Sequence, residues 1–402
     1  MRPLGINMSN VKQVNRSHVL WLLLTEGAMS RTDLASRLRL TTATLTSICG
    51  DFISRGIIIE EGKEASSSLG RKKSLLSINQ TYKYVISVNI HYTGSTIAIT
   101  NLMGEPLALE HFAIDPALDV PGAFQDIANR IVLLLWKTKL KNKDILGIGV
   151  DILGPVNHNE GIALHPFHVF HGQEVPIQKI LEELLPFPVC VESNVCSFLN
   201  AENLYGTAKY TANTMVVKWG PGVGSAASIN GALYKGANYQ SSEIGHTYFY
   251  RGSTTVCRCG KTGCLETGVH LNQITEKILS LQESSPVIRG ALLEYGQPTI
   301  HNIRKYLALD CLELRSYLTT LIYDLSIGIN NAISVFAPNK VILFGEIFEC
   351  PFVMETFIQQ VSKINPFLST DIFEQSSLAP RKEFIGGAAT AVQSFLLEPG
   401  GA

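Results

Sequence analysis

From Tyr84 onward, strand-like apolar runs alternate with helix-like segments, and this alternation limits the fold more than any other feature of the chain. The strand-like runs cover residues 84–90, 95–100, 145–152, 189–191, 215–217 and 341–344. Helical patterns cover residues 122–140, 194–205 and 312–336, and a last helix opens at Gly386. Because strands that alternate with helices form α/β folds, the pattern predicts two α/β lobes with a cleft between them.

The first eighty residues follow a different pattern, that of a helix-turn-helix and a hairpin. Apolar residues recur at roughly helical spacing through residues 10–26, and Ser30 and Thr41 are placed to cap a second and a third helix. After Gly56, two strand-like runs at 57–60 and 74–78 flank a polar turn. This predicts a winged helix-turn-helix whose third helix is offered to the DNA major groove. The alternative is a small helical dimerisation domain with a solvated basic face.

The charge distribution favours DNA binding by this N-terminal module. The whole chain has a net charge of −1, whereas residues 1–80 hold 11 basic and 6 acidic residues, a net charge of +5 that leaves −6 for the remainder. The outward face of the third helix offers only hydroxyl and methyl contacts to bases. The predicted DNA-binding residues are Thr42, Ala43, Thr46 and Ser47 on that helix, Arg31, Arg37 and Arg39 toward phosphates, and Arg71 and Lys72 at the wing.

The densest chemical motif is a histidine followed by three clustered cysteines. The predicted metal ligands are His246, Cys257, Cys259 and Cys264. Three thiolates and an imidazole suit tetrahedral zinc, and four protein ligands leave no position for a catalytic water, so we expect a structural Zn²⁺. The alternative is a set of buried free cysteines. The other cysteines are scattered, which predicts a reducing, cytoplasmic setting rather than a disulfide scaffold.

Two carboxylates and a glycine-rich stretch lie near this cluster. Glu243 and Glu266 could accept hydrogen bonds from the hydroxyls of a sugar, although helix capping and surface charge explain them equally well. Residues 220–224 could cradle a phosphate through backbone N–H groups, or could be a plain turn between strands.

These motifs together resemble the ROK family, and within it the branch of sugar-responsive transcriptional repressors. The resemblance covers about residues 8–398 and is most specific at residues 243–247, at residues 257–267 and at residues 30–35. It implies an actin/hexokinase-type, two-lobed sugar-kinase-like body behind the winged helix-turn-helix. It also implies that the sugar is bound by Ser193, Asn194, Glu243, His246 and Glu266.

The chain departs from the family's kinases at three places. Kinases of the family carry an Asn-Asp pair where this chain has Ser193 and Asn194, and an amide cannot act as the general base. The Asp-x-Gly-Gly-Thr phosphate loop is replaced by residues 89–93, where His91 and Tyr92 stand in place of glycines. The later Gly-Gly pair is replaced by Gly345-Glu346. We therefore expect the chain not to be an enzyme.

The expected domains are residues 1–80, the winged helix-turn-helix; residues 81–195, the first lobe, completed by residues 380–402; and residues 196–379, the second lobe with the zinc site. The expected function is a repressor of carbohydrate-related genes that binds double-stranded operator DNA as a homodimer or homotetramer and responds to a sugar or sugar derivative. Control by a protein partner is an alternative, and an active ATP-dependent sugar kinase with an appended DNA-binding module is another. No segment has the apolar length of a membrane span.

Overall fold

The computed structural model describes residues 7–63, 74–91, 94–167 and 169–401. The chain forms two compact units. The first comprises residues 1–209 and 381–402, and the second comprises residues 210–380. The first unit thus includes the helix 194–204, most of which we expected in the second lobe.

The N-terminal head of the first unit is the predicted winged helix-turn-helix. Its helices are α1 (Met8–Glu26), α2 (Arg31–Leu38) and α3 (Thr42–Ser54). Ser30 accepts a hydrogen bond from Asp33 N, and Thr41 accepts one from Thr44 N, so both predicted caps are formed. The wing strands β2 (Ile58–Lys63) and β3 (Ser74–Ile78) pair antiparallel. A short strand β1 (Met29–Ser30), which the sequence pattern did not predict, pairs with β3.

The body of the first unit is a five-stranded mixed sheet in the order β10-β7-β4-β5-β6. Its strands are β4 (Tyr84–Ile90), β5 (Ser95–Thr100), β6 (Pro106–Phe112), β7 (Ile145–Ile152) and β10 (Val189–Ser193). β4, β7 and β10 are parallel neighbours, so their carboxyl ends meet at one side of the sheet. Ligands of open α/β sheets bind at that side. The strands β8 (Val156–Asn157) and β9 (Ile162–Ala163) form a separate small hairpin.

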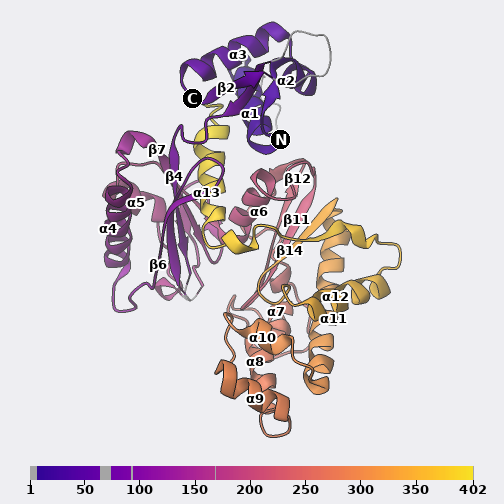
Figure 1. Ribbon diagram of the computed structural model, residues 1–402. Helices are drawn as coiled ribbons and strands as arrows, with labels where there is room; N and C mark the ends of the chain where they lie inside the picture. Colours follow the sequence, from indigo (N-terminus) through magenta and orange to yellow (C-terminus); the bar gives the residue numbers. More distant parts are fainter. Residues whose placement is uncertain (1–6, 64–73, 92–93, 168, 402) are drawn as a thin grey trace. The chain divides into compact units, whose positions relative to one another are not determined.

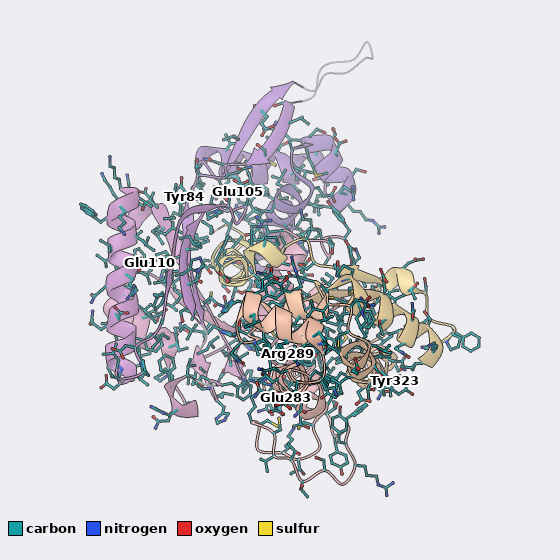
Figure 2. All side chains as sticks on the ribbon, turned by 60° about the horizontal axis from the view of Figure 1, so that its bottom comes forward. Tyr84, Glu105, Glu110, Glu283, Arg289 and Tyr323 are labelled. Carbon is teal, nitrogen blue, oxygen red and sulfur yellow. The ribbon has the colours of Figure 1, made fainter. Side chains whose placement is uncertain are left out.

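Helices cover both faces of this sheet. Figure 1 shows α4 (Val120–Thr138) and α5 (Ile177–Leu184) on one face, with α6 (Asn194–Leu204) and α13 (Ile385–Val392) on the other. Arg130 of α4 is bonded to Glu110 of β6 at 2.5 Å, and Figure 2 labels Glu110 beside that helix. Every residue of α13 is buried, because it packs against β4, β7 and α6.

The second unit is built on a sheet in the order β13-β12-β11-β14-β15. Its strands are β11 (Thr214–Trp219), β12 (Val223–Ile229), β13 (Ala232–Leu233), β14 (Lys340–Phe344) and β15 (Phe373–Gln375). Its helices are α7 (Leu265–Val269), α8 (Leu271–Ser280), α9 (Pro286–Tyr295), α10 (Ile303–Leu307), α11 (Leu312–Phe336) and α12 (Pro351–Ile364). Arg289 of α9 donates to the Glu283 carbonyl at 2.6 Å, and Figure 2 labels both residues.

The second unit has its own core, in which α11 packs on α12 and α7, and Trp219 is fully buried. Across the described ranges, none of the helices combines the length and the apolar character that crossing a membrane requires.

Candidate functional site

The structure brings the four predicted metal ligands together in the second unit. The ligand atoms of His246, Cys257, Cys259 and Cys264 all lie within 4.8 Å of one another. Cys259 Sγ is 3.6 Å from Cys264 Sγ, and Cys257 Sγ is 3.5 Å from His246 Nδ1. Thiolates about 2.3 Å from a tetrahedral ion stand roughly 3.8 Å apart, so this spacing fits one small cation. The cluster can hold a metal ion, and it is the only such group in the described part of the chain.

Tight turns in the backbone place these ligands. Cys257 N donates to the Lys261 carbonyl at 2.7 Å and closes the hairpin that carries two of the thiols. Gly260 and Gly263 have φ of 83° and 73°, a region that strongly favours glycine. A Cβ on Gly263 would also lie 2.5 Å from the Tyr248 ring. The chain therefore folds back at these two glycines.

The protonation of the cluster follows from its burial. Burial lowers the pKa of His246, which keeps its imidazole neutral and able to bind a cation. Burial also raises the pKa of the Cys257 thiol, and raises that of Cys264 to about 12. Because thiols bind metals as thiolates, a bound cation must displace these protons.

Glu266 is held by an arginine that the sequence analysis did not single out. Arg258 Nε and Nη2 donate to Glu266 Oε1 and Oε2 at 2.8 and 2.7 Å, and Val223 N donates to Oε2 at 2.9 Å. The exposed fractions of the two side chains are 18% for Arg258 and 4% for Glu266. Arg258 lies between the clustered cysteines, eight residues before the carboxylate that we expected to bind a sugar. A basic residue at that place was the sequence signal for this buried ion pair.

The glycine-rich stretch makes room for that ion pair. Residues 220–222 form the turn between β11 and β12, with Gly220 N donating to the Gly222 carbonyl. A Cβ on Gly222 would lie 2.0 Å from Arg258 Nη2 and 2.3 Å from Glu266 Oε2. Of the two interpretations left open, the structure thus shows the turn between strands.

Glu243 lies on the loop that leads into the cluster. Ile244 N donates to Ser225 Oγ at 3.3 Å, which fixes the loop against β12. Burial, and secondarily the charge of Glu266, raise the pKa of Glu243 to about 7. A carboxyl group poised in this way can either accept or donate a hydrogen bond near neutral pH.

Ser193 and Asn194 belong to the first unit, at the carboxyl end of β10. Ser193 is the last residue of the strand, and half-buried Asn194 is the first of α6. The neighbouring Glu192 is 5% exposed and accepts a hydrogen bond from Ser193 N at 2.9 Å. Its carboxylate is thus engaged with its own backbone.

Residues 89–91, which stand where the resemblance places the phosphate loop of a kinase, begin with a side chain that is hydrogen-bonded to the neighbouring strand β7. Asn89 donates its amide to Asp151 Oδ1, and Asp151 Oδ2 accepts from Gly387 N at 3.1 Å. Asp151 is 2% exposed. His91 lies at the end of β4, whereas Tyr92 and Thr93 lie outside the described residues.

The predicted DNA-binding residues divide into three groups. Thr42, Ala43, Thr46 and Ser47 are all exposed on α3, although Thr46 Oγ1 also donates to the Thr42 carbonyl at 2.7 Å. Arg31 and Arg37 form ion pairs with Glu60 and Glu26, at 2.5 and 2.8 Å, while Arg39 is exposed at the end of α2. Arg71 and Lys72 lie outside the described residues.

This fold and this cluster define a class of protein: a two-lobed, sugar-kinase-like body that carries an N-terminal winged helix-turn-helix. The chain belongs to the ROK family, whose model matches residues 85–393. It is 25% identical to the xylose repressor of Caldicellulosiruptor bescii over 98% of this chain and 99% of that protein. It is 27% identical to the DNA-binding transcriptional dual regulator NagC of Escherichia coli over 87% of this chain and 84% of that protein.

Solved structures of the family share the fold. A ROK family transcriptional regulator, described as a homologue of the E. coli MLC protein, superposes with a TM-score of 0.79 at 22% identity, over 97% of this chain and 98% of that one. A ROK family glucokinase from Streptomyces griseus superposes with a TM-score of 0.66 at 18% identity, over 77% of this chain and all of that one. The predicted combination of folds is confirmed. Because the family includes both regulators and kinases, membership alone leaves catalysis undecided.

Proposed function

We propose that this protein is a sugar-responsive transcriptional repressor of carbohydrate-related genes, and not an enzyme. One observation carries the proposal: a winged helix-turn-helix with an exposed, uncharged α3 face is joined to a ROK body that has Asn194 where a kinase needs a carboxylate. Relatives named xylose repressor, which align with nearly the whole chain, support it.

The proposed operator contacts combine α3 with flanking cations. Thr42, Ala43, Thr46 and Ser47 face the major groove, where hydroxyl groups bond base edges and methyl groups contact thymine. Arg39 is the best placed of the predicted phosphate contacts, because Arg31 and Arg37 already pair with carboxylates. Arg71 and Lys72, which lie outside the described residues, are the remaining proposed contacts. A homodimer or homotetramer would present two such heads to half-sites about one helical turn apart.

The proposed effector is a sugar or a sugar derivative. The proposed sugar-binding residues are Glu243, His246 and Glu266 in the second unit and Ser193 and Asn194 in the first, and each set by itself offers acceptors and donors to hydroxyl groups. Without a carboxylate at position 194, the first unit has no base there to deprotonate a bound sugar. General base catalysis contributes roughly 10²–10⁴-fold, so its loss alone removes most turnover.

The proposed metal is structural Zn²⁺. A neutral imidazole and three thiols within 4.8 Å match the nitrogen and sulfur ligands that zinc prefers. When bound, the ion would tie the loop at His246 to the hairpin at Cys257–Cys264. Glu243 and Glu266, at either end of this segment, would thereby be held in place.

A duplex selection followed by gel-shift titration tests the regulatory function. Genomic fragments retained by the full chain are re-titrated with and without D-xylose and N-acetylglucosamine. Thr42→Asp should weaken binding at least tenfold, because it places a negative charge against the groove. Ser54→Asp, the same charge at the far end of α3, is the matched control and should change binding less than threefold. Failure to retain any fragment at low salt would refute DNA binding.

An ATP-consumption assay over a sugar panel tests the absence of kinase activity. Turnover at an ordinary enzymatic rate, lost on Asn194→Ala, would overturn the proposal. Control by a protein partner instead of a sugar would show as a partner captured from extract whose addition releases the selected duplex.

A further inference from the structure

The C-terminal segment of the chain lies on the DNA-binding head. α13 continues through a π-helical turn (Gln393–Leu397), and the residues after it reach α1. Gln13 Nε2 donates to the Glu398 carbonyl at 2.6 Å, and Arg16 Nε donates to the Gly400 carbonyl at 2.7 Å. These bonds join residues more than 380 positions apart in sequence.

Gly401 enters the apolar core of the head. It is buried, and a Cβ at this position would lie 2.9 Å from the Phe52 ring, 3.1 Å from Leu20 and 3.4 Å from Ile57. Phe52 belongs to α3, and Leu20 belongs to α1. The end of the chain therefore completes the packing between the first and third helices of the head.

Arg16 joins this segment to α3. The same guanidinium that bonds Gly400 pairs with Asp51 of α3 at 2.7 Å and stacks over the Phe52 ring at 4.4 Å from its centroid. Its side chain is only 12% exposed. Any displacement of the C-terminal segment thus acts on the two α3 residues that Arg16 holds.

The other end of α13 is fixed to two parallel strands of the sheet, near the carboxyl end of β7 and midway along β4. Gly387 N donates to Asp151, and Ser87 Oγ donates to the Phe384 carbonyl at 2.6 Å. Asp151 is in register with Glu192 of β10, one residue before Ser193. A buried helix thus spans from the side of the sheet where ligands bind to the core of the head.

We propose that Glu398–Gly401 is a structural element of the DNA-binding head that stabilises α3. We further propose that α13 couples the carboxyl end of the first unit's sheet to α3 through Arg16. The proposal rests on the proposed function only where duplex binding is the readout. A π-helical turn is consistent with this role, because such turns occur frequently at functional sites.

Hydrogen exchange of the full chain tests the structural part without any DNA. Deleting residues 398–402, or Arg16→Gln, should raise amide exchange in α3 at least tenfold. Arg55→Gln is the matched control, since Arg55 also faces Asp51, at 3.8 Å, but makes no hydrogen bond or ion pair to the described residues 398–401. It should leave exchange in α3 within twofold. Equal effects of Arg16→Gln and Arg55→Gln would overturn the proposal.

The coupling is tested by a change at the far end of α13. Asp151→Asn should raise exchange in α3 about threefold in the full chain and leave it unchanged in the chain that lacks residues 398–402. The deletion of residues 398–402, Arg16→Gln and Asp151→Asn should each weaken binding of the duplex selected above at least fivefold. Arg55→Gln should leave that binding unchanged. An exchange response to Asp151→Asn that persists without the segment would refute the coupling. If exchange behaves as expected but no duplex binds, the proposed function fails and the coupling stands.

Discussion

The Arg258–Glu266 ion pair allows a quantitative prediction for Arg258→Ala. The substitution removes two of the three hydrogen bonds that the Glu266 carboxylate accepts and leaves only Val223 N. Stranding one partner of a fully buried pair costs about 3–5 kcal/mol. Arg258 is 18% exposed, so water partly replaces it and the lower end applies. We expect the free energy of unfolding of the second unit to fall by about 3 kcal/mol, roughly a hundredfold in the equilibrium constant.

A probe confined to the second unit is required, because two compact units need not unfold together. Trp219 is buried there, whereas the other tryptophans, Trp21 and Trp136, belong to the first unit. Urea unfolding followed by Trp219 fluorescence in a Trp21→Phe/Trp136→Phe background therefore measures the unfolding of the second unit. The double variant Arg258→Ala/Glu266→Gln should recover part of the loss, since no charge is left stranded.

The Arg304–Glu349 pair supplies the control for this measurement. Its atoms are as close, at 2.6 Å, but its side chains are 61% and 31% exposed. Exposed pairs contribute about 0–1 kcal/mol, so Arg304→Ala should lower stability by less than that. If Arg258→Ala lowered the free energy of unfolding no more than Arg304→Ala does, burial would not strengthen the Arg258–Glu266 pair. That result would refute the prediction.

Three further predictions concern the same unit. The raised pKa of Glu243, about 7 against an ordinary 4.5, means that its proton favours the folded state. Stability should therefore fall as pH rises from about 4.5 to about 7, and Glu243→Gln should abolish that slope in urea titrations; a slope that survives the substitution would contradict the assignment. Dialysis against a strong chelator should release zinc and expose the loop at Cys257–Cys264 to protease, as should Cys259→Ser, whereas Cys311→Ser should retain the metal; release of no metal from the purified chain would contradict the site. Gly263→Ala should lower the stability of the unit by about 1–3 kcal/mol in the Trp219 assay, because φ is 73° and the new Cβ meets the Tyr248 ring. An unchanged midpoint would show that the turn adapts.

The sequence alone determined whatever depends on near neighbours in the chain. The caps at Ser30 and Thr41 were predictable because a cap bonds a backbone N–H only three residues ahead. The cysteine cluster was predictable because close spacing forces its thiols to share a small volume. Six strands of the two five-stranded sheets were predicted from apolar runs, but β6, β12, β13 and β15 were not. The runs also did not give the strand order, since an apolar run records burial and not which strand lies beside it.

Only the tertiary structure decided which distant groups meet. Asp151 bonds the backbone of Gly387, 236 residues away, and Arg16 bonds Gly400, 384 residues away. A polar residue in a sequence shows that it needs a partner when buried, but not where that partner lies. Even Arg258 and Glu266, only eight residues apart, pair across the turns at Gly260 and Gly263 that lie between them. The attachment of the chain's end to the head followed from packing that no local pattern encodes.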